Sequence, residues 1–358
     1  MGYLFTHIKN LFVPFPKVKS MEGLYGLEKA NALFHNLVAE KKVPGLAVFI
    51  LDKGEIQLQK GYGFANLENR KKIDPKQTVF RIASISKCIT GLALGKMMED
   101  GIVDLDESFY TYVPDYPKKK YDFTLRQLAS HTAGIRGYRG KEFALNQDYS
   151  IKEGIEVFKN DPLFFEPGTG YLYNSFDFVL LSLAMQEASG IPFKQYVEKN
   201  ILTPLGLKNT FSQQKSVRPS AVENIAQFYT KTSLCFKQAV EVNNAYKLAG
   251  GGYLSTCEDV AKLGKLILQH KLLTKETYDQ LLTSQIIEGQ PTFYGLGFQV
   301  SQDVKGRPFV GHVGNSVGAY TNLFVYPEKE KVVAILINCT DPKVQPILDE
   351  VIDSVLNL

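Results

Sequence analysis

Apolar positions recur along this chain with two different periods, and their order predicts how the chain folds. Residues 24–37 carry apolar side chains at every third or fourth position, which predicts an amphipathic helix. Residues 46–51 and 56–62 then have the pattern of two strands, joined by a turn at Lys53-Gly54. The N-terminal part therefore predicts a helix followed by a β-hairpin.

Strand-like patterns return near the C-terminus. We expect strands over residues 297–302, 308–313, 319–326 and 331–338, and a closing helix over residues 344–355. Strands at both ends of the chain, with helices between them, predict one antiparallel sheet assembled from distant segments. The terminal helices should cover one face of that sheet.

The stretch between the two sets of strands is mainly helical in pattern. Residues 82–98 are apolar almost all round, which predicts a buried helix. Further helices are expected over residues 178–188, 193–201 and 259–270. The fold class is therefore α/β in the broad sense (α+β). We predict an N-terminal extension (1–20), a discontinuous sheet domain (21–83 and 250–358) and an inserted, mainly helical domain (84–249). A cleft between two such units is where small-molecule sites prefer to lie.

Composition excludes several classes of protein. The 358 residues are 44% hydrophobic and 22% charged, with a net charge of +4, which is typical of a globular chain without a basic face for nucleic acid. No run of 18 apolar residues could form a spanning helix. The four cysteines have no paired spacing, and no metal-ligand spacing appears, so we expect neither a metal nor an organic cofactor.

Ser84 and Lys87 are the strongest candidates for chemistry. They lie three residues apart at the start of the predicted buried helix, where positions i and i+3 share a face. A serine hydroxyl is a weak nucleophile until a neighbouring base takes its proton. Burial depresses the pKa of a lysine and suits it to that task. The pattern S-x-x-K alone is common, and its alternative meaning is an N-cap serine followed by a surface-reaching lysine.

Two later motifs favour the catalytic interpretation. Together with residues 84–87, the segments Tyr173-Asn174-Ser175 and His312-Val313-Gly314 resemble the three signatures of the serine β-lactamase and penicillin-binding protein superfamily. The likeness is greatest to its class C-like branch, which includes D-alanyl-D-alanine carboxypeptidases, D-aminopeptidases and β-lactamase-fold esterases. It extends over residues 43–338, with supporting blocks at 61–66, 124–134, 165–170, 249–256 and 294–298. The resemblance implies a β-lactamase/transpeptidase-like fold.

The resemblance also implies roles for the residues that match the first two motifs. Ser84 would be the nucleophile that accepts the acyl group, and Lys87 would be its base or proton relay. Tyr173 would be a second base, working as a phenolate stabilised by Lys87 and then protonating the leaving group. Because a phenol titrates near 10 when unperturbed, this role requires nearby positive charge or hydrogen-bond donors.

The third motif and its neighbour would complete the site. His312 takes the place where many relatives carry the lysine of a Lys-Thr-Gly strand, and it would bind substrate as a mostly neutral imidazole. Gly314 would let the strand backbone approach the substrate closely. The backbone N–H groups of Ser84 and Asn315 would form the oxyanion hole.

Ser175 departs from the pattern of the superfamily, whose second motif is usually Tyr-x-Asn. Either the Ser175 hydroxyl replaces the amide that contacts the substrate, or Asn174 covers part of that role. A hydroxyl is shorter than a carboxamide and has a single donor, so the grip on the substrate should differ. Efficient β-lactam turnover is therefore less expected than acyl transfer itself.

Two other residues could be mistaken for catalytic groups. Residues 314–318 spell the G-x-S-x-G pattern of α/β-hydrolases around Ser316, but that motif requires a following helix, and residues 319–325 are strand-like. His131, within Ser130-His131-Thr132, is expected to be a structural residue at a helix end, because a buried histidine is usually hydrogen-bonded.

These observations predict a serine hydrolase that forms an acyl-enzyme at Ser84 on a small ester, a D-amino-acid amide or short peptide, or a β-lactam. The alternative is a catalytically silent ligand-binding or assembly protein on the same fold. The resemblance suggests a soluble, periplasmic or otherwise extracytoplasmic protein, although residues 1–20 lack the apolar core of a signal peptide. We expect that extension to be ordered and packed on the domain. The sequence makes no prediction of oligomeric state.

Overall fold

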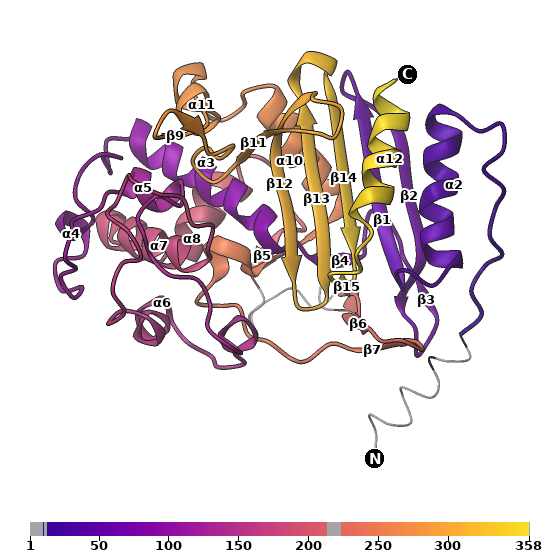
Figure 1. Ribbon diagram of the computed structural model, residues 1–358, viewed down its shortest axis with the longest axis horizontal. Helices are drawn as coiled ribbons and strands as arrows, with labels where there is room; N and C mark the ends of the chain where they lie inside the picture. The colour runs from indigo at the N-terminus through magenta and orange to yellow at the C-terminus, as the bar shows by residue number, and fades with distance from the viewer. Residues whose placement is uncertain (1–9, 11–12, 213–222, 358) are drawn as a thin grey trace.

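A seven-stranded antiparallel sheet forms one half of the molecule in the computed structural model, which describes residues 10, 13–212 and 223–357 (Figure 1). The strand order is β11-β12-β13-β14-β1-β2-β3. The strands are β1 (Gly45–Asp52), β2 (Glu55–Asn66), β3 (Lys71–Lys72), β11 (Gln299–Gln302), β12 (Pro308–Ser316), β13 (Ala319–Tyr326) and β14 (Lys331–Ile337). β1 pairs with β14 in the centre, with Leu46 opposite Ile337. The predicted sheet built from both ends of the chain is confirmed.

The expected strands agree with the observed ones to within a few residues, and one of the differences has a clear cause. The strand expected from residue 297 begins at Gln299. Gly297 has a φ of +88°, and a Cβ added there would lie 2.6 Å from the Lys87 carbonyl oxygen. Gly297 therefore belongs to a turn that presses against the first turn of the Ser84 helix.

Helices cover both faces of the sheet. The predicted terminal helices, α2 (Gly26–Ala39) and α12 (Gln345–Leu356), pack against one another and against one face, where Val48 and Ile335 point (Figure 1). Helix α10 (Cys257–Leu268) packs on the other face against β1, β13 and β14. Because both faces are covered, β1 and β14 are apolar and buried along almost their whole length.

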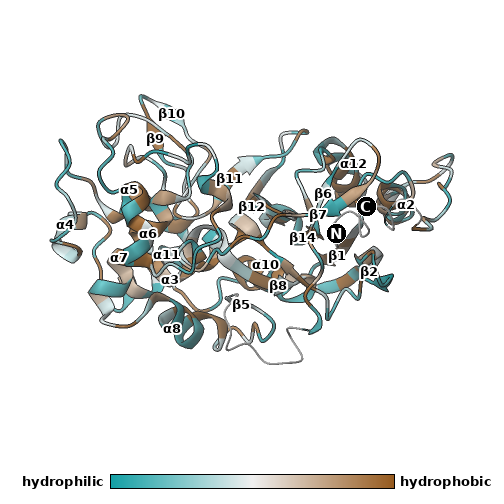
Figure 2. Cartoon of the chain, turned by 90° about the horizontal axis from the view of Figure 1, so that it is seen from below, coloured by the Kyte–Doolittle hydropathy of each residue, from teal (hydrophilic) through white to brown (hydrophobic). Residues whose placement is uncertain are grey.

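The second half of the molecule is built from helices around α3 (Ser86–Glu99) and α7 (Phe176–Ser189). Eleven of the fourteen residues of α3 are buried, so the predicted all-round apolar helix is confirmed. The other helical elements of the described residues in this half are α4 (Phe109–Tyr112), α5 (Leu125–Ala129), α6 (Ile151–Gly154), α8 (Phe193–Val197), α11 (Lys275–Leu281), π-helical turns at Glu198–Leu202 and Leu248–Gly252, and 3₁₀ turns at Glu142–Ala144 and Ile155–Val157. Cartoon colouring by hydropathy shows brown, apolar segments concentrated where these helices meet the sheet (Figure 2).

Short strands complete the structure. β4 (Val79–Arg81), β8 (Tyr253–Thr256) and β5 (Phe211–Ser212) form a small sheet that leads into Ser84. β6 (Tyr229–Lys231), β7 (Phe236–Gln238) and β15 (Cys339–Thr340) form another, and β9 (Ile286–Ile287) and β10 (Gln290–Pro291) form a hairpin. One hydrophobic cluster runs from α7 through α3 to the sheet, so the core is continuous across the predicted domain boundary, which itself stays a prediction.

The predicted N-terminal extension lies mostly outside the described residues. Within the described part, Val13 is buried, and the Phe15 ring packs edge-on against Phe64 at 6.1 Å between centroids. Among the described residues, no helix combines the length and apolarity that a membrane crossing requires.

Candidate active site

Ser84 lies in a strained turn between β4 and α3. The turn is a 3₁₀-helix, Ala83–Ile85, and α3 begins directly after it. Ala83 has a φ of +47°, a conformation that costs a non-glycine residue on the order of 1–3 kcal/mol. The Thr321 hydroxyl donates to the Ile82 carbonyl at 3.0 Å, which fixes the turn against β13. Ser84 therefore precedes the long helix by two residues and is held there by the sheet.

Lys87 is fully buried and contacts Ser84, as the sequence predicted. Its Nζ lies 3.2 Å from the Ser84 Oγ and donates to the Gly250 carbonyl at 2.7 Å. Burial lowers the pKa of Lys87 to about 7, against the opposing effects of Asp177 and Cys88. A large fraction of the amine is therefore neutral near pH 7 and able to accept a proton.

Tyr173 completes the contacts of the Ser84 hydroxyl. The Tyr173 hydroxyl donates to the Ser84 Oγ at 2.7 Å, and the Lys87 Nζ lies 4.8 Å from the centre of the Tyr173 ring. Loss of solvent around the phenol raises the pKa of Tyr173, although 40% of the residue as a whole is exposed. In the resting site Tyr173 is therefore a phenol, and its role as a phenolate stays a prediction. Burial holds the proton on Tyr173 but lowers the pKa of Lys87 to about 7, so Lys87 is the better placed base.

His312 does not face the cleft directly. It is 1% exposed, and its Nδ1 lies 2.6 Å from the Val313 carbonyl, which can only accept a hydrogen bond. Nδ1 therefore carries the proton, and Nε2 accepts from the Tyr294 hydroxyl at 2.9 Å. Burial lowers the pKa of His312 to about 3, so the expected neutral imidazole is present. Because both ring nitrogens are already hydrogen-bonded, His312 has no free donor or acceptor for the predicted direct contact with substrate.

Gly314 and Asn315 follow on β12, beside the Ser84 turn. A Cβ on Gly314 would lie 2.9 Å from the Ala83 Cβ and 3.0 Å from the Ile82 carbonyl oxygen. The glycine therefore allows β12 to approach the nucleophile turn, which is a different reason from the predicted approach to substrate. Asn315 and Ser84 both line the same cleft.

That cleft has a volume of about 360 Å³ and contains three of the predicted residues, Ser84, Ser175 and Asn315. Ser175 is the residue before α7, and Tyr138 is hydrogen-bonded to it. A larger hollow of about 770 Å³, between α8 and β5, contains none of the predicted site residues.

Sequence reasoning missed several residues that line the cleft: Tyr138, Asn244, Lys247 and Asp341. Lys247 is 4% exposed, and its Nζ donates to the Phe143 carbonyl at 3.0 Å. Burial lowers its pKa to about 8. Its position three residues before Gly250, which holds Lys87, was the only available signal in the sequence.

Ser316 is a strand residue, as expected. It lies opposite Ala319 at the end of the β12–β13 hairpin, and no helix follows it. The arrangement therefore lacks the strand-to-helix turn of a nucleophile elbow. No group of three metal-ligating side chains occurs in the described ranges.

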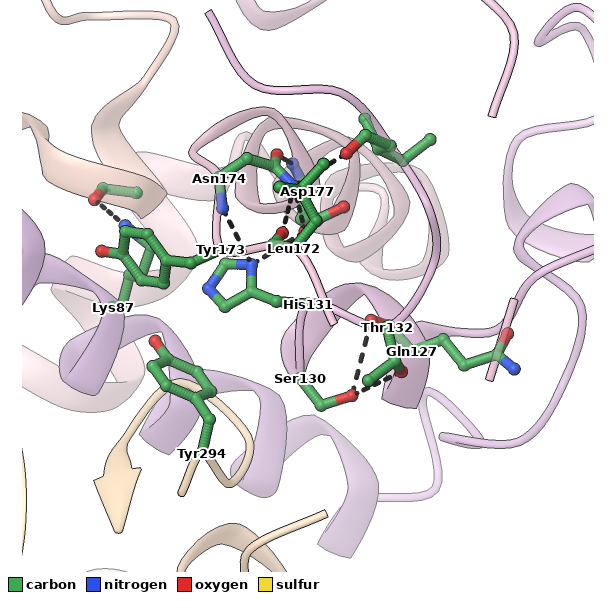
Figure 3. A network of polar contacts seen from close by, with 12 residues as sticks. Lys87, Gln127, Ser130, His131, Thr132, Leu172, Tyr173, Asn174, Asp177 and Tyr294 are labelled. Atoms are coloured by element: carbon green, nitrogen blue, oxygen red, sulfur yellow. Dashed lines mark hydrogen bonds and ion pairs between the residues drawn. The ribbon is translucent and has the colours of Figure 1, made fainter. Parts of the chain in front are cut away.

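Behind Tyr173, the structure brings together two residues that the sequence did not connect. His131 Nδ1 lies 2.8 Å from Asp177 Oδ2, and the His131 ring centre lies 4.5 Å from that of Tyr173 (Figure 3). His131 follows α5, as expected for a residue at a helix end, with a φ of +63°. Both side chains are fully buried.

Comparison with known proteins shows the family and the fold. Residues 30–357 match the family model described as Beta-lactamase. The human mitochondrial serine beta-lactamase-like protein LACTB is 29% identical over 85% of this chain and 72% of its own length. The octameric penicillin-binding protein homologue from Pyrococcus abyssi superposes with a TM-score of 0.78 at 26% identity, over 92% of this chain and 77% of that one. The D-amino acid amidase from Ochrobactrum anthropi SV3, complexed with D-phenylalanine, has a TM-score of 0.79 at 21% identity, over 92% and 98%.

Proposed function

The chain belongs to the beta-lactamase family, and on that premise we propose that it is a serine hydrolase that forms an acyl-enzyme at Ser84. Its substrate is a small ester, a D-amino-acid amide or short peptide, or a β-lactam. One observation carries the proposal: the Ser84 Oγ lies within 3.2 Å of the Lys87 Nζ and within 2.7 Å of the Tyr173 hydroxyl. Nucleophile, base and acid thus meet at one oxygen atom.

The first half of the reaction uses the neutral amine of Lys87. Lys87 takes the proton of the Ser84 hydroxyl as Oγ attacks the substrate carbonyl, and a tetrahedral oxyanion forms. Tyr173 gives its phenolic proton to the leaving alcohol or amine, and the Lys87 ammonium returns a proton to the phenolate. Water then hydrolyses the acyl-Ser84 ester by the same groups acting in reverse.

The oxyanion is stabilised by the backbone N–H groups of Ser84 and Asn315. Two features support this assignment: both residues line the cleft, and Gly314 lets β12 come close to the Ser84 turn. Fixed donors of this kind typically contribute about 10²- to 10³-fold to kcat.

The cleft supports small acyl groups more than a β-lactam nucleus. Ser175 presents a hydroxyl where many relatives have an amide, and Tyr138 is bonded to it. The Ochrobactrum protein, whose fold this chain shares, is a D-amino acid amidase. D-amino-acid amides and simple esters are therefore the first substrates to test.

The decisive experiment is mass mapping of the protein after labelling with a fluorophosphonate probe. We expect one adduct, on the peptide that contains Ser84, and none in the Ser84→Ala variant. The Ser316→Ala variant is the matched control, because Ser316 lines the same cleft and should leave the adduct in place. An adduct on Ser316, or none on either serine, would overturn the proposal.

A silent ligand-binding or assembly protein is the second candidate. The serine at position 175 and the raised pKa of Tyr173 favour it, because both weaken the usual catalytic pattern. Ser84-dependent turnover of any small ester or amide would decide against it.

A further inference from the structure

Asp177 and His131 form a buried pair that the proposed reaction does not use. Asp177 lies in the first turn of α7, and its Oδ2 is 2.8 Å from His131 Nδ1 and accepts from the Asn174 side-chain amide at 2.6 Å. Neither Asp177 nor His131 is exposed to solvent. Figure 3 shows the pair on the side of Tyr173 away from the Lys87 amine. A buried carboxyl group is costly unless it is paired and hydrogen-bonded.

The pair holds the segment that carries Tyr173. The Leu172 N–H donates to the His131 carbonyl at 2.9 Å, which fixes the residue before the tyrosine. Asn174, the residue after it, is bonded to both the carboxylate and the backbone N–H of Asp177. With the tilted His131 ring packed against it at 4.5 Å between centroids, Tyr173 has little freedom to leave the Ser84 hydroxyl.

The pair also acts on Lys87 through its charge. Lys87 gains a proton when Ser84 attacks, and it must then exist as an ammonium in a fully buried place. Within the described part of the chain, Lys87 has no carboxylate within ion-pair distance, and Asp177 is the carboxyl group that raises the pKa of Lys87. The other titratable groups around it are neutral at working pH: Cys88 on α3, Tyr173 before α7, His131 after α5, Tyr294 before β11 and His312 on β12.

Asp177 can gain or lose a proton in this setting. Burial raises the pKa of Asp177 well above its ordinary value, while the Asn174 amide and Lys87 act in the opposite direction. Its Oδ1 and the Nε2 of His131 have no hydrogen-bond partner among the described residues. Burial thus raises the pKa of Asp177 and lowers that of Lys87, and the charge of each group favours the charged form of the other.

We propose that the His131–Asp177 pair positions Tyr173 on Ser84 and supplies the negative charge that stabilises the Lys87 ammonium formed during acylation. Both residues are positioning residues, because neither touches Ser84 or a bound acyl group. The inference rests on the proposed function of Ser84 as the nucleophile, and it adds a fourth and a fifth residue to that machinery.

The test is the pH dependence of the rate at which a fluorophosphonate labels Ser84. In this step the Ser84 oxygen forms a bond to phosphorus, fluoride leaves, and the serine proton goes to Lys87, so turnover of a natural substrate is not required. Without the charge of Asp177 the pKa of Lys87 falls. The labelling rate should rise with pH (the acid limb of the profile) and then reach a plateau. In Asp177→Asn we therefore expect the acid limb to move to lower pH by at least half a unit and the plateau rate to fall about tenfold or more.

Asp259→Asn is the matched control. Asp259 is also a buried aspartate in the first turn of a helix, α10, and burial likewise raises its pKa, but it bonds to Asn209 and Thr210 away from the site. Its variant should keep the acid limb of the natural protein. If Asp177→Asn and Asp259→Asn have the same acid limb, the charge coupling is wrong.

Two more variants separate charge from position. His131→Gln retains an N–H that can reach Asp177, so it should lower the plateau through a looser Tyr173 and leave the acid limb in place. Asn174→Ser removes a hydrogen-bond donor from the Asp177 carboxylate, so it should move the acid limb of the labelling profile to lower pH by less than Asp177→Asn does. This variant also tests the coupling if the Asp177→Asn protein does not fold. No shift in Asn174→Ser would also overturn the coupling. A natural protein that is never labelled at Ser84 contradicts the proposed function instead.

Discussion

Lys87 is anchored to Gly250, 163 positions away in the sequence, more tightly than to its neighbour Ser84. The Lys87 Nζ donates to the Gly250 carbonyl at 2.7 Å and lies 3.2 Å from the Ser84 Oγ. A carbonyl can only accept, so this bond takes one N–H of the amine in either protonation state. The lone pair of the neutral amine is then free for the Ser84 hydroxyl, which itself accepts from Tyr173. The three side chains thus meet at the Ser84 oxygen, to which Tyr173 donates and beside which the Lys87 amine lies.

Replacement of Ser84 gives the simplest prediction. Ser84→Ala should abolish hydrolysis of p-nitrophenyl acetate or butyrate, because among the described residues Ser84 is the hydroxyl that contacts both Lys87 and Tyr173. Ser316→Ala should keep most of the activity, since Ser316 lies at the end of strand β12, opposite Ala319, and not at a strand-to-helix turn. Initial rates of the purified variants check this, and a dead Ser316→Ala beside an active Ser84→Ala would contradict the assignment.

Replacement of the two proton-transfer groups should lower the rate without abolishing binding. We expect Lys87→Ala and Tyr173→Phe each to reduce kcat by about 10²- to 10⁴-fold, the usual contribution of a positioned acid or base. Lys87→Arg should not restore activity, because a guanidinium does not give up its proton at working pH. An active Lys87→Arg variant would show that Lys87 acts only as a charge.

The pH dependence of kcat/KM should follow the protonation of the Lys87 amine. Because burial lowers the pKa of Lys87 to about 7, the active neutral form is the minority below that pH and the majority above it. kcat/KM for a neutral ester should therefore rise as the pH increases through about 7 and level off above 8. A profile that rises only near pH 10, where an ordinary lysine or tyrosine titrates, would show that burial does not act on Lys87 in this way.

The strands and the catalytic motifs could be predicted because they depend on local pattern. The apolar and aromatic run over residues 319–326 predicted β13, and the spacing of Ser84 and Lys87 predicted their contact. Tyr173 required the family resemblance, since it is 89 positions from Ser84 and its own segment is irregular.

The burial of the site residues and their long-range contacts could not be predicted. They depend on which distant segments cover a residue, and no local pattern in the sequence records this. His312 was correctly placed on a strand, but its burial follows from Tyr294, which reaches it from the loop before β11. Asp177 lies in the first turn of α7, and only the path of residues 130–132 brings His131 to it. For the same reason the sequence placed Lys247 near the cleft only through its closeness to Gly250.

Lys247 should be a source of instability. Burial lowers its pKa to about 8 from an ordinary value of 10.5, so the unfolded chain holds the proton more tightly than the folded one. The resulting loss of folding free energy is complete below pH 8, decreases between pH 8 and 10.5, and vanishes above pH 10.5. Lys247→Met should therefore raise the thermal midpoint by a few degrees at pH 7, and the gain should shrink by pH 10.

Lys262→Met is the control for that measurement. Lys262 lies on α10, and its Nζ donates to the Gly206 carbonyl at an exposed site. Lys262→Met should therefore not raise the thermal midpoint at pH 7. A Lys247→Met variant that is less stable than the natural protein at pH 7 would indicate that the bond to the Phe143 carbonyl outweighs the burial of the charge.

Substrate preference should reflect the uncharged third motif. The buried, neutral His312 cannot pair with a substrate carboxylate as the lysine of many relatives does, so simple esters should have a higher kcat/KM than nitrocefin. His312→Lys should not gain activity on nitrocefin, because its ammonium would be buried against Tyr294 and the variant should lose thermal stability. Measuring both substrates on both proteins checks this. Fast nitrocefin hydrolysis by the natural protein, with negligible esterase activity, would identify a true β-lactamase and show that carboxylate recognition comes from elsewhere in the cleft.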